Sequence, residues 1–479
     1  MKTARRGQFL FLVKKFMCGI VGIYRKEKNC ALDVYESLVM LQHRGQDAAG
    51  LVTFDGRYFH ETKGEGLARD VLTEDVLRNS PGTMGIGHVR YPTAGAHSAK
   101  EAQPFFVHQP FGIYLVHNGN LTNTDALRER VGQRYFTHLR TDSDSEMLLA
   151  VLARRLYNTT SKLPSDQKKE MLFQAVCETM DRISGAYSVI AMVDKVGLLA
   201  FRDPHGIRPL VIGTNSAGEY CFASEDVAFG PIGFTPLRDV KPGEAILIDT
   251  AGEMHTMQCQ ESEHRPCLFE YIYLARPDST LDDISVYKTR LRMGKKLAEQ
   301  IKRADLAIDS VMCVPTSSRP VAMELAQTLG ISYREGLVKS RYVGRTFIMP
   351  TQEDRELSVR RKLGVVPLEF KDKNILLVDD SIVRGTTMRK TVQLCRDAGA
   401  RAVYVASGSP PVRFQNIYGV DLPTKEELVA HNREIEEIRK EIGADALFYQ
   451  TLEDMCSACS EGNSDITKFE DSCFTGNYL

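Results

Sequence analysis

Short apolar segments separated by turn residues dominate the chain from Cys18 to about residue 248. Segments rich in β-branched residues and bounded by Gly, Pro, Asn or Asp predict strands at 18–24, 85–90, 113–117, 187–192, 198–202 and 245–248. Apolar residues at three- and four-residue spacing predict helices at 33–41, 144–156 and 169–183. The pattern therefore predicts a layered α/β domain with largely antiparallel sheets.

The order of predicted strands and helices changes after a polar stretch at 258–265, which we interpret as a linker. Strands predicted at 310–314, 374–378 and 402–406 then alternate with helices at 320–329 and 386–398, which is typical of a parallel sheet with helices on both faces. A capping box of Thr424 and Glu427 predicts a further helix that ends at Gly443. We expect an extra segment at 1–17, domains at 18–250 and 260–445, and a C-terminal tail at 446–479.

Composition and charge exclude several classes of protein. The 479 residues are 43% hydrophobic and carry a net charge of −1, which is enough material for two or three domains. The near-zero net charge does not indicate nucleic acid or a membrane surface as a partner. No apolar run approaches the ~20 residues that are needed to cross a bilayer. The 11 cysteines are odd in number and scattered, which favours reduced thiols and a cytoplasmic location.

The first 17 residues are basic and hold only a short apolar patch. A secretory signal needs a longer apolar region followed by small residues, so we do not interpret this segment as one. The remaining interpretations are a short propeptide or a start codon placed too early, with Met17 as the true start.

Cys18 directly follows Met17 and opens an apolar strand. If Met17 is removed, the α-amine of Cys18, with an ordinary pKa near 8, can take the proton of the thiol on the same residue. The sulfur can then attack a glutamine carboxamide, form a thioester and release ammonia. An ordinary buried strand cysteine is the alternative, and the motifs that follow argue against it.

Four motifs follow Cys18 in order. They are QHRGQDAAG at 42–50, GHVRYPT at 87–93, HNGN at 117–120 and TDSDSE at 141–146. Arg90 ends a strand and suits a carboxylate clamp, while the Asn118 side chain and the Gly119 N–H are the two donors of an oxyanion hole. A carboxylate at the start of a helix, such as Asp144, can hold a substrate ammonium.

Residues 18–250 with these motifs resemble the class II, N-terminal-nucleophile glutamine amidotransferases. The resemblance implies a four-layer αββα sandwich. It also implies that Cys18 is the nucleophile, that Asn118 and Gly119 form the oxyanion hole, and that Arg90 and Asp144 bind glutamine, with Thr93 orienting it.

The stretch NILLVDDSIVRGTT at 374–387 places two acids at the end of a buried strand and a glycine before a helix. Backbone N–H groups and the Thr386 and Thr387 hydroxyls can cradle a phosphate there. Asp379 and Asp380 can reach ribose hydroxyls or a magnesium ion carried by a pyrophosphate. The stretch resembles the phosphoribosyl pyrophosphate (PRPP) signature of type I phosphoribosyltransferases. The PRPP-binding residues we expect from it are Asp379, Asp380, Ser381, Arg384, Gly385, Thr386 and Thr387.

Two further segments belong to the same expectation. In the resembled family the loop at 314–319 receives the pyrophosphate, and a hydroxyl matching Ser317 places the metal, so Ser317, Asp379 and Asp380 are the expected Mg²⁺ residues, with one ion per subunit. The basic stretch at 339–362 is either a solvated loop or a lid that excludes water from PRPP. From it we expect Lys339 and Arg345 to contact PRPP.

The chain from Cys18 to about residue 450 resembles the amidophosphoribosyltransferase family, transferases of purine biosynthesis. The resemblance implies glutamine and PRPP as substrates, 5-phosphoribosylamine as product, purine nucleotides as feedback inhibitors, and a homotetramer or homodimer. Some members hold a [4Fe–4S] cluster. Here Asn416 stands where cluster-bearing relatives carry a cysteine, so we expect none. A non-catalytic nucleotide-binding regulator and an amidotransferase with a different phosphoribosyl acceptor are the alternatives.

Overall fold

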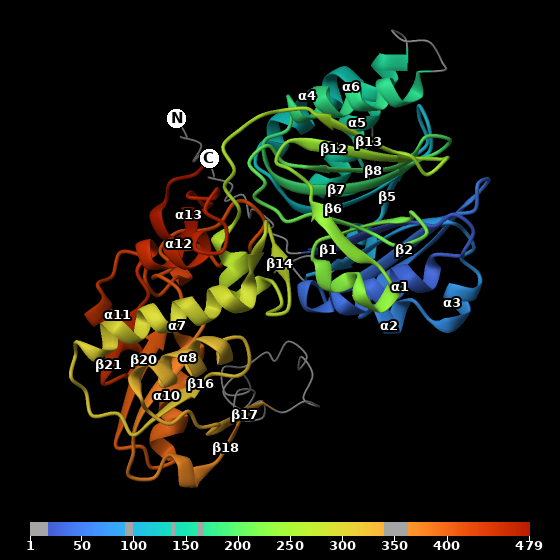
Figure 1. Ribbon diagram of the computed structural model, residues 1–479. Helices are drawn as coiled ribbons and strands as arrows, with labels where there is room; N and C mark the ends of the chain where they lie inside the picture. The colour runs from blue at the N-terminus through green and yellow to red at the C-terminus, as the bar shows by residue number, and fades with distance from the viewer. Residues whose placement is uncertain (1–17, 92–98, 136–138, 161–166, 340–362) are drawn as a thin grey trace, which may run out of the picture.

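Two antiparallel sheets stack on each other in the first domain of the computed structural model (Figure 1). The structure describes residues 18–91, 99–135, 139–160, 167–339 and 363–479. One sheet has the order β11-β9-β10-β1-β4-β2-β3 and the other β13-β12-β8-β7-β6-β5. The strands of the first sheet are β1 (Cys18–Tyr24), β2 (Ala48–Phe54), β3 (Phe59–Glu65), β4 (Met84–Arg90), β9 (Val211–Thr214), β10 (Tyr220–Ala223) and β11 (Thr235–Asp239). Those of the second are β5 (Phe105–Val107), β6 (Ile113–Leu121), β7 (Gly185–Val193), β8 (Gly197–Arg202), β12 (Glu244–Asp249) and β13 (Met254–Gln258).

Helices cover the outer face of each sheet. In Figure 1, α1 (Ala31–Met40), α2 (Ala68–Val71) and α3 (Glu74–Arg78) lie against the first sheet, and α4 (Thr124–Tyr135), α5 (Asp144–Thr160) and α6 (Lys168–Met180) against the second. The two-residue alternation of the strands explains these layers, because Ile20 packs between the sheets whereas its neighbour Val21 packs in the core that contains α1. The result is an αββα sandwich.

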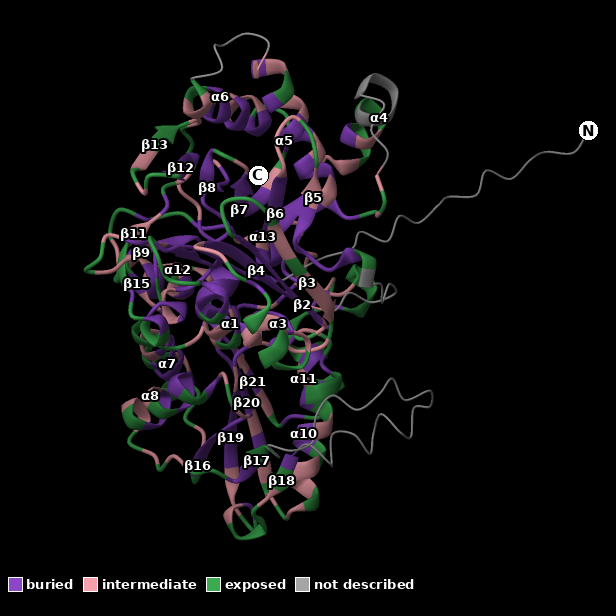
Figure 2. Cartoon of the chain, turned by 90° about the vertical axis from the view of Figure 1, so that its right-hand side faces the viewer, coloured by how far each residue is buried: buried purple, intermediate pink, exposed green. Residues whose placement is uncertain are grey.

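A four-stranded parallel sheet with the order β16-β19-β20-β21 forms the centre of the second domain. Leu376 and Val378 pack on the side of α7 and α8, and Ile375 and Leu377 pack on the side of α10 and α11. In Figure 2 these strands, which are largely buried, lie between α7 and α8 on one side and α10 and α11 on the other. The elements are β16 (Ser310–Cys313), β19 (Asn374–Asp379), β20 (Ala402–Ser407), β21 (Ala446–Tyr449), α7 (Val286–Lys302), α8 (Arg319–Leu329), α10 (Thr386–Asp397) and α11 (Ile435–Ile442). Both parts of the predicted fold class are confirmed.

Shorter elements complete the molecule. Two antiparallel pairs, β14 with β15 and β17 with β18, flank the second domain, and α12 and α13 close the chain. Their bounds are β14 (Thr280–Leu281), β15 (Ile284–Ser285), β17 (Leu337–Lys339), β18 (Leu363–Val365), α12 (Leu452–Ser460) and α13 (Ser472–Thr475). No helix in the described part of the chain has both the length and the apolar character needed to span a bilayer.

Three expectations differ from the structure. The helix predicted from Thr424 to Gly443 is a 3₁₀ turn, Lys425–Glu427, followed by the separate helix α11. The sheet extends past the expected domain end at residue 445, because β21 is its edge strand. Cys177 and Cys259 form a disulfide, whereas we expected reduced thiols.

Candidate active sites at the domain interface

Cys18 and Arg90 are direct partners in the antiparallel register of β1 and β4. Cys18 is 1% exposed, and this burial raises the pKa of its thiol to about 12. A backbone hydrogen bond from Tyr91 and the charge of Arg90 act in the opposite direction, and the charge of Asp144 adds to the increase. The thiol therefore needs a base beside it before it can act as a nucleophile.

Arg90 lies between two carboxylates that the motif analysis did not single out. Its guanidinium donates to Glu101, and its Nη1 lies 3.5 Å from Asp47 Oδ2. Asp47 belongs to the 42–50 motif, but nothing in the sequence pattern distinguishes Glu101. The expected clamp for a substrate carboxylate is thus held in place by carboxylates of the chain itself. Thr93, predicted to orient glutamine, lies outside the described residues.

Asn118 and Gly119 lie on β6 with geometry suited to an oxyanion hole. The Asn118 side chain is 1% exposed, and its Nδ2 has no hydrogen-bond partner among the described residues. Gly119 has a φ of +151°, and a Cβ there would lie 2.0 Å from the Ala186 carbonyl oxygen, so only glycine fits. Burying a hydrogen-bond donor without a partner costs free energy unless the oxygen of a ligand accepts a hydrogen bond from it.

Asp144 begins α5 and is fixed by neighbouring polar groups. Its Oδ2 accepts from the Leu121 N–H at 3.0 Å, and its Oδ1 accepts from the Ser145 hydroxyl at 3.3 Å. The same hydroxyl lies 2.9 Å from His117 Nδ1. Asp144 is 5% exposed and close enough to Cys18 to influence its thiol. The structure therefore brings together the residues we expected to bind glutamine, apart from Thr93.

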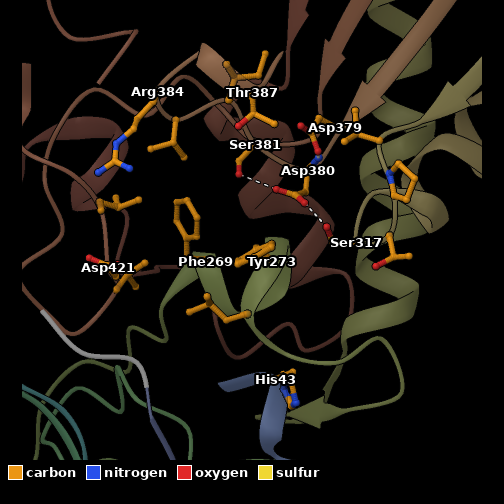
Figure 3. Close-up of a pocket in the computed structure, with 18 of the residues that line it drawn as sticks. His43, Phe269, Tyr273, Ser317, Asp379, Asp380, Ser381, Arg384, Thr387 and Asp421 are labelled. Atoms are coloured by element: carbon orange, nitrogen blue, oxygen red, sulfur yellow. Dashed lines mark hydrogen bonds between the residues drawn. The ribbon is translucent and has the colours of Figure 1, made fainter. Parts of the chain in front are cut away.

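The second site lies where β16 and β19 end at the same edge of the parallel sheet (Figure 3). Ser317 donates to Asp380, and Ser381 Oγ donates to Asp380 Oδ1 at 2.7 Å. The Asp380 N–H in turn donates to Asp379 Oδ1 at 2.9 Å. Burial raises the pKa of both carboxyls, and their mutual repulsion adds to this for Asp379. Such a pair favours a bound cation.

The turn before α10 is shaped for an anion. Gly385 caps the helix with a φ of +72°, and a Cβ there would lie 2.9 Å from Val429 Cγ2. Thr386 and Thr387 follow it and are exposed. Arg384 is also exposed, and its Nη2 lies 3.3 Å from Glu427 Oε1. The first N–H groups of the helix, two hydroxyls and the positive end of the helix dipole coincide at this point.

One cavity of about 920 Å³ joins the two domains. The second domain contributes all the described residues expected to bind PRPP, including Lys339, together with Arg290. The first domain contributes His43, Arg44, Gln46 and Tyr91. Arg345 and the rest of the basic segment at 340–362 lie outside the described residues.

A network of buried ion pairs lies beside this cavity, and the sequence patterns did not predict it. Arg44 donates to Glu225 and, through Nη2, to Glu270 Oε2 at 2.8 Å. Arg208 also donates to Glu270. The Arg44 charge, with further hydrogen bonds, holds the pKa of Glu225 well below its usual range despite complete burial. The network fixes the 42–50 motif of the first domain to the π-helical turn Glu270–Leu274 of the second.

Arg290 is the other residue that the sequence did not indicate. Its Nε donates to the Tyr271 carbonyl and its Nη2 to the Ala275 carbonyl, each at 2.9 Å. Burial lowers the pKa of Arg290 to about 10, and the nearby Asp380 charge acts in the opposite direction. It therefore provides a cation beside the acid pair.

The residues near Asn416 do not fit an iron–sulfur cluster. Asn416 is fully buried; its Oδ1 accepts from the Tyr418 N–H and its Nδ2 donates to Glu470 Oε2 at 3.1 Å. A [4Fe–4S] cluster needs four thiolates. The described residues contain no group of three or more His, Cys, Asp or Glu side chains that could hold a metal.

Comparison with known proteins agrees with this geometry. A glutamine amidotransferase domain model matches residues 88–230, and a phosphoribosyl transferase domain model matches residues 282–408. The amidophosphoribosyltransferase of Pseudomonas aeruginosa is 50% identical over 469 residues, covering 97% of this chain and 93% of that protein. The chain belongs to the amidophosphoribosyltransferase family. The resemblance seen in the sequence and the prediction of an enzyme of purine biosynthesis are confirmed.

Other members of the family agree over nearly the whole chain. The Escherichia coli amidophosphoribosyltransferase is 51% identical over 472 residues, with 97% of this chain and 92% of that protein covered. The glutamine PRPP amidotransferase of B. subtilis, solved with ADP and GMP, superposes with a TM-score of 0.85 at 37% identity, covering 96% of this chain and 97% of that one. Amidophosphoribosyltransferases carry out the first step of purine biosynthesis, and this is the function of the chain.

Proposed function

We propose that the enzyme converts glutamine, PRPP and water into 5-phosphoribosylamine, glutamate and pyrophosphate, and that Cys18 begins the reaction. The observation that carries this assignment is the shared cavity, which has Asp379, Asp380 and the start of α10 on one side. On the other side it has Tyr91, the residue directly after Arg90. Ammonia released at Cys18 is thus delivered to the ribose inside the protein.

In the glutamine half-reaction, Arg90 binds the substrate carboxylate and Asp144 its ammonium group. The Cys18 α-amine takes the thiol proton, which overcomes the burial that raises the thiol pKa. The sulfur bonds to the carboxamide carbon, and the oxygen becomes an anion stabilised by Asn118 Nδ2 and the Gly119 N–H. The C–N bond then breaks with proton transfer to nitrogen, and water hydrolyses the thioester to glutamate. This mechanism requires that residues 1–17 are absent from the working enzyme.

In the second half-reaction, the turn from Ser381 to Thr387 binds the 5-phosphate of PRPP at the N-terminus of α10. Asp379 and Asp380 bind the ribose hydroxyls, and the loop containing Ser317 receives the pyrophosphate. Ammonia forms a bond to C1 of the ribose, and the C1–oxygen bond breaks to release pyrophosphate. Lys339 contributes positive charge to the leaving group, and Arg345 has the same proposed role.

Magnesium fits the acid pair. Two adjacent carboxyls with raised pKa values, beside the Ser317 hydroxyl, offer the oxygen donors that Mg²⁺ takes in partnership with substrate phosphates. When bound, one ion per subunit neutralises charge on the pyrophosphate. Asp379, Asp380 and Ser317 are the residues that would hold it.

The remaining parts of the assignment are also proposals. Purine nucleotides act as feedback inhibitors at the phosphate-binding groups, which the B. subtilis relative solved with ADP and GMP supports. The enzyme is a cytoplasmic homo-oligomer, a tetramer or a dimer. The amidotransferase domain spans 18–250, and the phosphoribosyltransferase domain begins near residue 260 and includes β21.

A coupled assay on protein that begins at Cys18 tests the assignment. Glutamate and pyrophosphate should form together when glutamine, PRPP and Mg²⁺ are all present, and mass spectrometry should detect 5-phosphoribosylamine. Absence of pyrophosphate release with either glutamine or ammonium would contradict it and favour the non-catalytic regulator. A different phosphoribosyl product would favour an amidotransferase with another acceptor.

A further inference from the structure

Arg290 is a buried cation that forms no ion pair within the described part of the chain. It lies on α7 and is 1% exposed. Its hydrogen bonds go to two uncharged acceptors, the carbonyl oxygens of Tyr271 and Ala275, each at 2.9 Å. A charge inside a protein costs free energy unless an opposite charge lies beside it. The fold therefore leaves Arg290 without the counter-charge that a bound anion can supply.

Two acids influence Arg290 from a longer distance without compensating it. The charges of Asp380 and Glu225 raise the pKa of Arg290, but the effect of burial is larger and leaves this pKa at about 10 instead of 12.5. Both carboxylates are bound to other side chains, because Asp380 accepts a hydrogen bond from Ser317 and Glu225 accepts one from Arg44. Neither acid serves as the direct partner of the Arg290 guanidinium.

One nitrogen of Arg290 remains for a ligand. The residue lines the cavity that joins the two domains. The two backbone carbonyls occupy Nε and Nη2, so Nη1 is the nitrogen without a partner among the described residues. The same two hydrogen bonds fix the plane of the guanidinium. An anion that binds to Nη1 therefore meets a group that is already oriented, which reduces the entropy lost on binding.

The position of α7 indicates which anionic group this is. Helix α7 packs with α8 on one face of the parallel sheet, and α10 lies on the other face (Figure 2). Met293, one turn after Arg290, lies beneath the acid pair, because a Cβ built on Gly408 would be 3.5 Å from Met293 Cε and 3.4 Å from the Asp380 carbonyl oxygen. The loop at 314–317, which leads into α8, lines the same cavity. Arg290 thus lies on the side of the loop proposed to receive pyrophosphate, away from the 5-phosphate turn before α10.

We propose that Arg290 binds the pyrophosphate of PRPP through Nη1 and stabilises the charge that this group gains as it leaves. The inference rests on the proposed function of the second site. The lone pair of ammonia forms the C1–N bond while the electrons of the C1–oxygen bond go to pyrophosphate, and the nitrogen then releases a proton to water. A fixed cation interacts most strongly with the pyrophosphate when its charge is greatest. Arg290 therefore raises kcat in addition to lowering the KM for PRPP.

The test compares Arg290→Lys and Arg290→Met with the same two substitutions of Arg292. Arg292 lies on the same helix, but its Nη1 donates to the Ala458 carbonyl oxygen at 3.2 Å, and it is not among the described residues that line the cavity. Each protein begins at Cys18 and is assayed with PRPP, Mg²⁺ and ammonium chloride, so that the glutamine site takes no part. Because pH changes the amount of free ammonia, each rate is divided by that of the unsubstituted enzyme at the same pH.

Arg290→Met removes the charge, and we expect kcat/KM for PRPP to fall by about a hundredfold at every pH. Arg290→Lys keeps a charge at neutral pH. The burial that lowers the pKa of Arg290 should lower that of the lysine to about 8, so its relative rate should fall about tenfold between pH 7 and pH 9. Both Arg292 variants should stay within about twofold of the unsubstituted enzyme at either pH.

Binding of Mg²⁺ with pyrophosphate separates a contact with the ligand from a role in holding the chain. The mixture should raise the Tm of Arg290→Lys at pH 7, and the increase should be about half as large or less at pH 9. In the unsubstituted enzyme the increase should be similar at both pH values. Arg290→Met should show little increase at either pH.

Two results would overturn the inference. One is an equal loss of activity in Arg290→Lys and Arg290→Met that does not change with pH, because Arg290 would then only hold the carbonyls of residues 271 and 275. The other is a full increase in Tm with pyrophosphate in Arg290→Met. If Arg290→Met does not fold, the pH dependence of Arg290→Lys decides by itself. Failure of the unsubstituted enzyme to release pyrophosphate would instead count against the proposed function.

Discussion

Cys18 and Arg90 lie opposite each other in the register of β1 and β4, so the proposed nucleophile and the proposed carboxylate clamp belong to one pair of strands. The backbone after Arg90 hydrogen-bonds the Cys18 thiol through Tyr91, which also lines the cavity shared with the second domain. A change at the cavity can therefore reach the glutamine site through one residue.

Cys18→Ser should abolish glutamine-dependent synthesis but leave the second site working. A hydroxyl is a much weaker nucleophile than a thiolate, so we expect a loss of at least about a thousandfold with glutamine. Pyrophosphate release with ammonium should stay close to that of the unsubstituted enzyme. Cys221→Ser is the control, because Cys221 is equally buried in the same domain but lies on β10, away from the proposed roles. Retained glutamine-dependent activity in Cys18→Ser would disprove the assigned nucleophile.

Asp379→Asn should make the enzyme more stable and less active. Because burial and the Asp380 charge raise the folded-state pKa of Asp379, the unfolded chain loses its proton first as pH rises. The contribution of Asp379 to the free energy of unfolding is therefore largest below the ordinary Asp pKa, and it decreases as pH rises from there through the raised pKa of the folded state. At neutral pH we expect a higher Tm for the variant and about a hundredfold lower activity with ammonium.

Mg²⁺ with pyrophosphate provides a binding measurement for the same residue. The mixture should raise the Tm of the unsubstituted enzyme and have little effect on Asp379→Asn, because the variant lacks one of the two carboxylates. Equal shifts for both proteins would show that Asp379 does not take part in holding the ion.

Gly385→Ala should weaken PRPP binding specifically. The residue needs a φ of +72°, and its Cβ would lie 2.9 Å from Val429 Cγ2, so the turn before α10 must move. We expect about a tenfold increase in the KM for PRPP. Gly399→Ala is a matched control at the other end of α10, with a φ of +96° but a nearest neighbour at 3.4 Å. The control should cost stability of about 1 kcal/mol and leave this KM unchanged.

Glu225→Gln should destabilise the junction between the domains. Removing the Glu225 charge leaves two buried arginines, Arg44 and Arg208, sharing the charge of Glu270, at a cost of about 3–5 kcal/mol in the free energy of unfolding. The pKa of Glu225 is lowered on folding, so its contribution is present in full above the ordinary Glu value of about 4.3 and decreases progressively as pH falls from there through the lowered folded-state value. Urea unfolding at pH 7 and pH 4 checks this, because the difference between the two proteins should shrink at the lower pH.

Glu436→Gln controls for the loss of any glutamate charge. Glu436 pairs with Arg439 on the exposed surface of α11, where such pairs contribute little. A similar loss of stability for Glu436→Gln and Glu225→Gln would contradict the importance given to the buried network.

Local patterns in the sequence determined most elements and the identity of the key side chains. A continuous apolar run predicts β1, because a strand between a sheet and a helix layer must bury both faces. The acids after 374–378 mark the binding edge of a parallel sheet. Local signals gave a wrong prediction at Thr424, where the capping box begins a single 3₁₀ turn and not a long helix. The strand β21 was not predicted, because its four residues are too few to show a periodic pattern.

Only the tertiary structure decided which of these side chains meet. The pairing of Cys18 with Arg90 depends on strand register, and the Arg44 network and the Asn120–Ile417 contact join residues 181 to 297 positions apart. Sequence patterns describe how each element buries its own surface. Contacts between elements depend on how all of them pack at once, and for that reason Glu101, Arg290 and Asn120 carried no local signal of the positions they take.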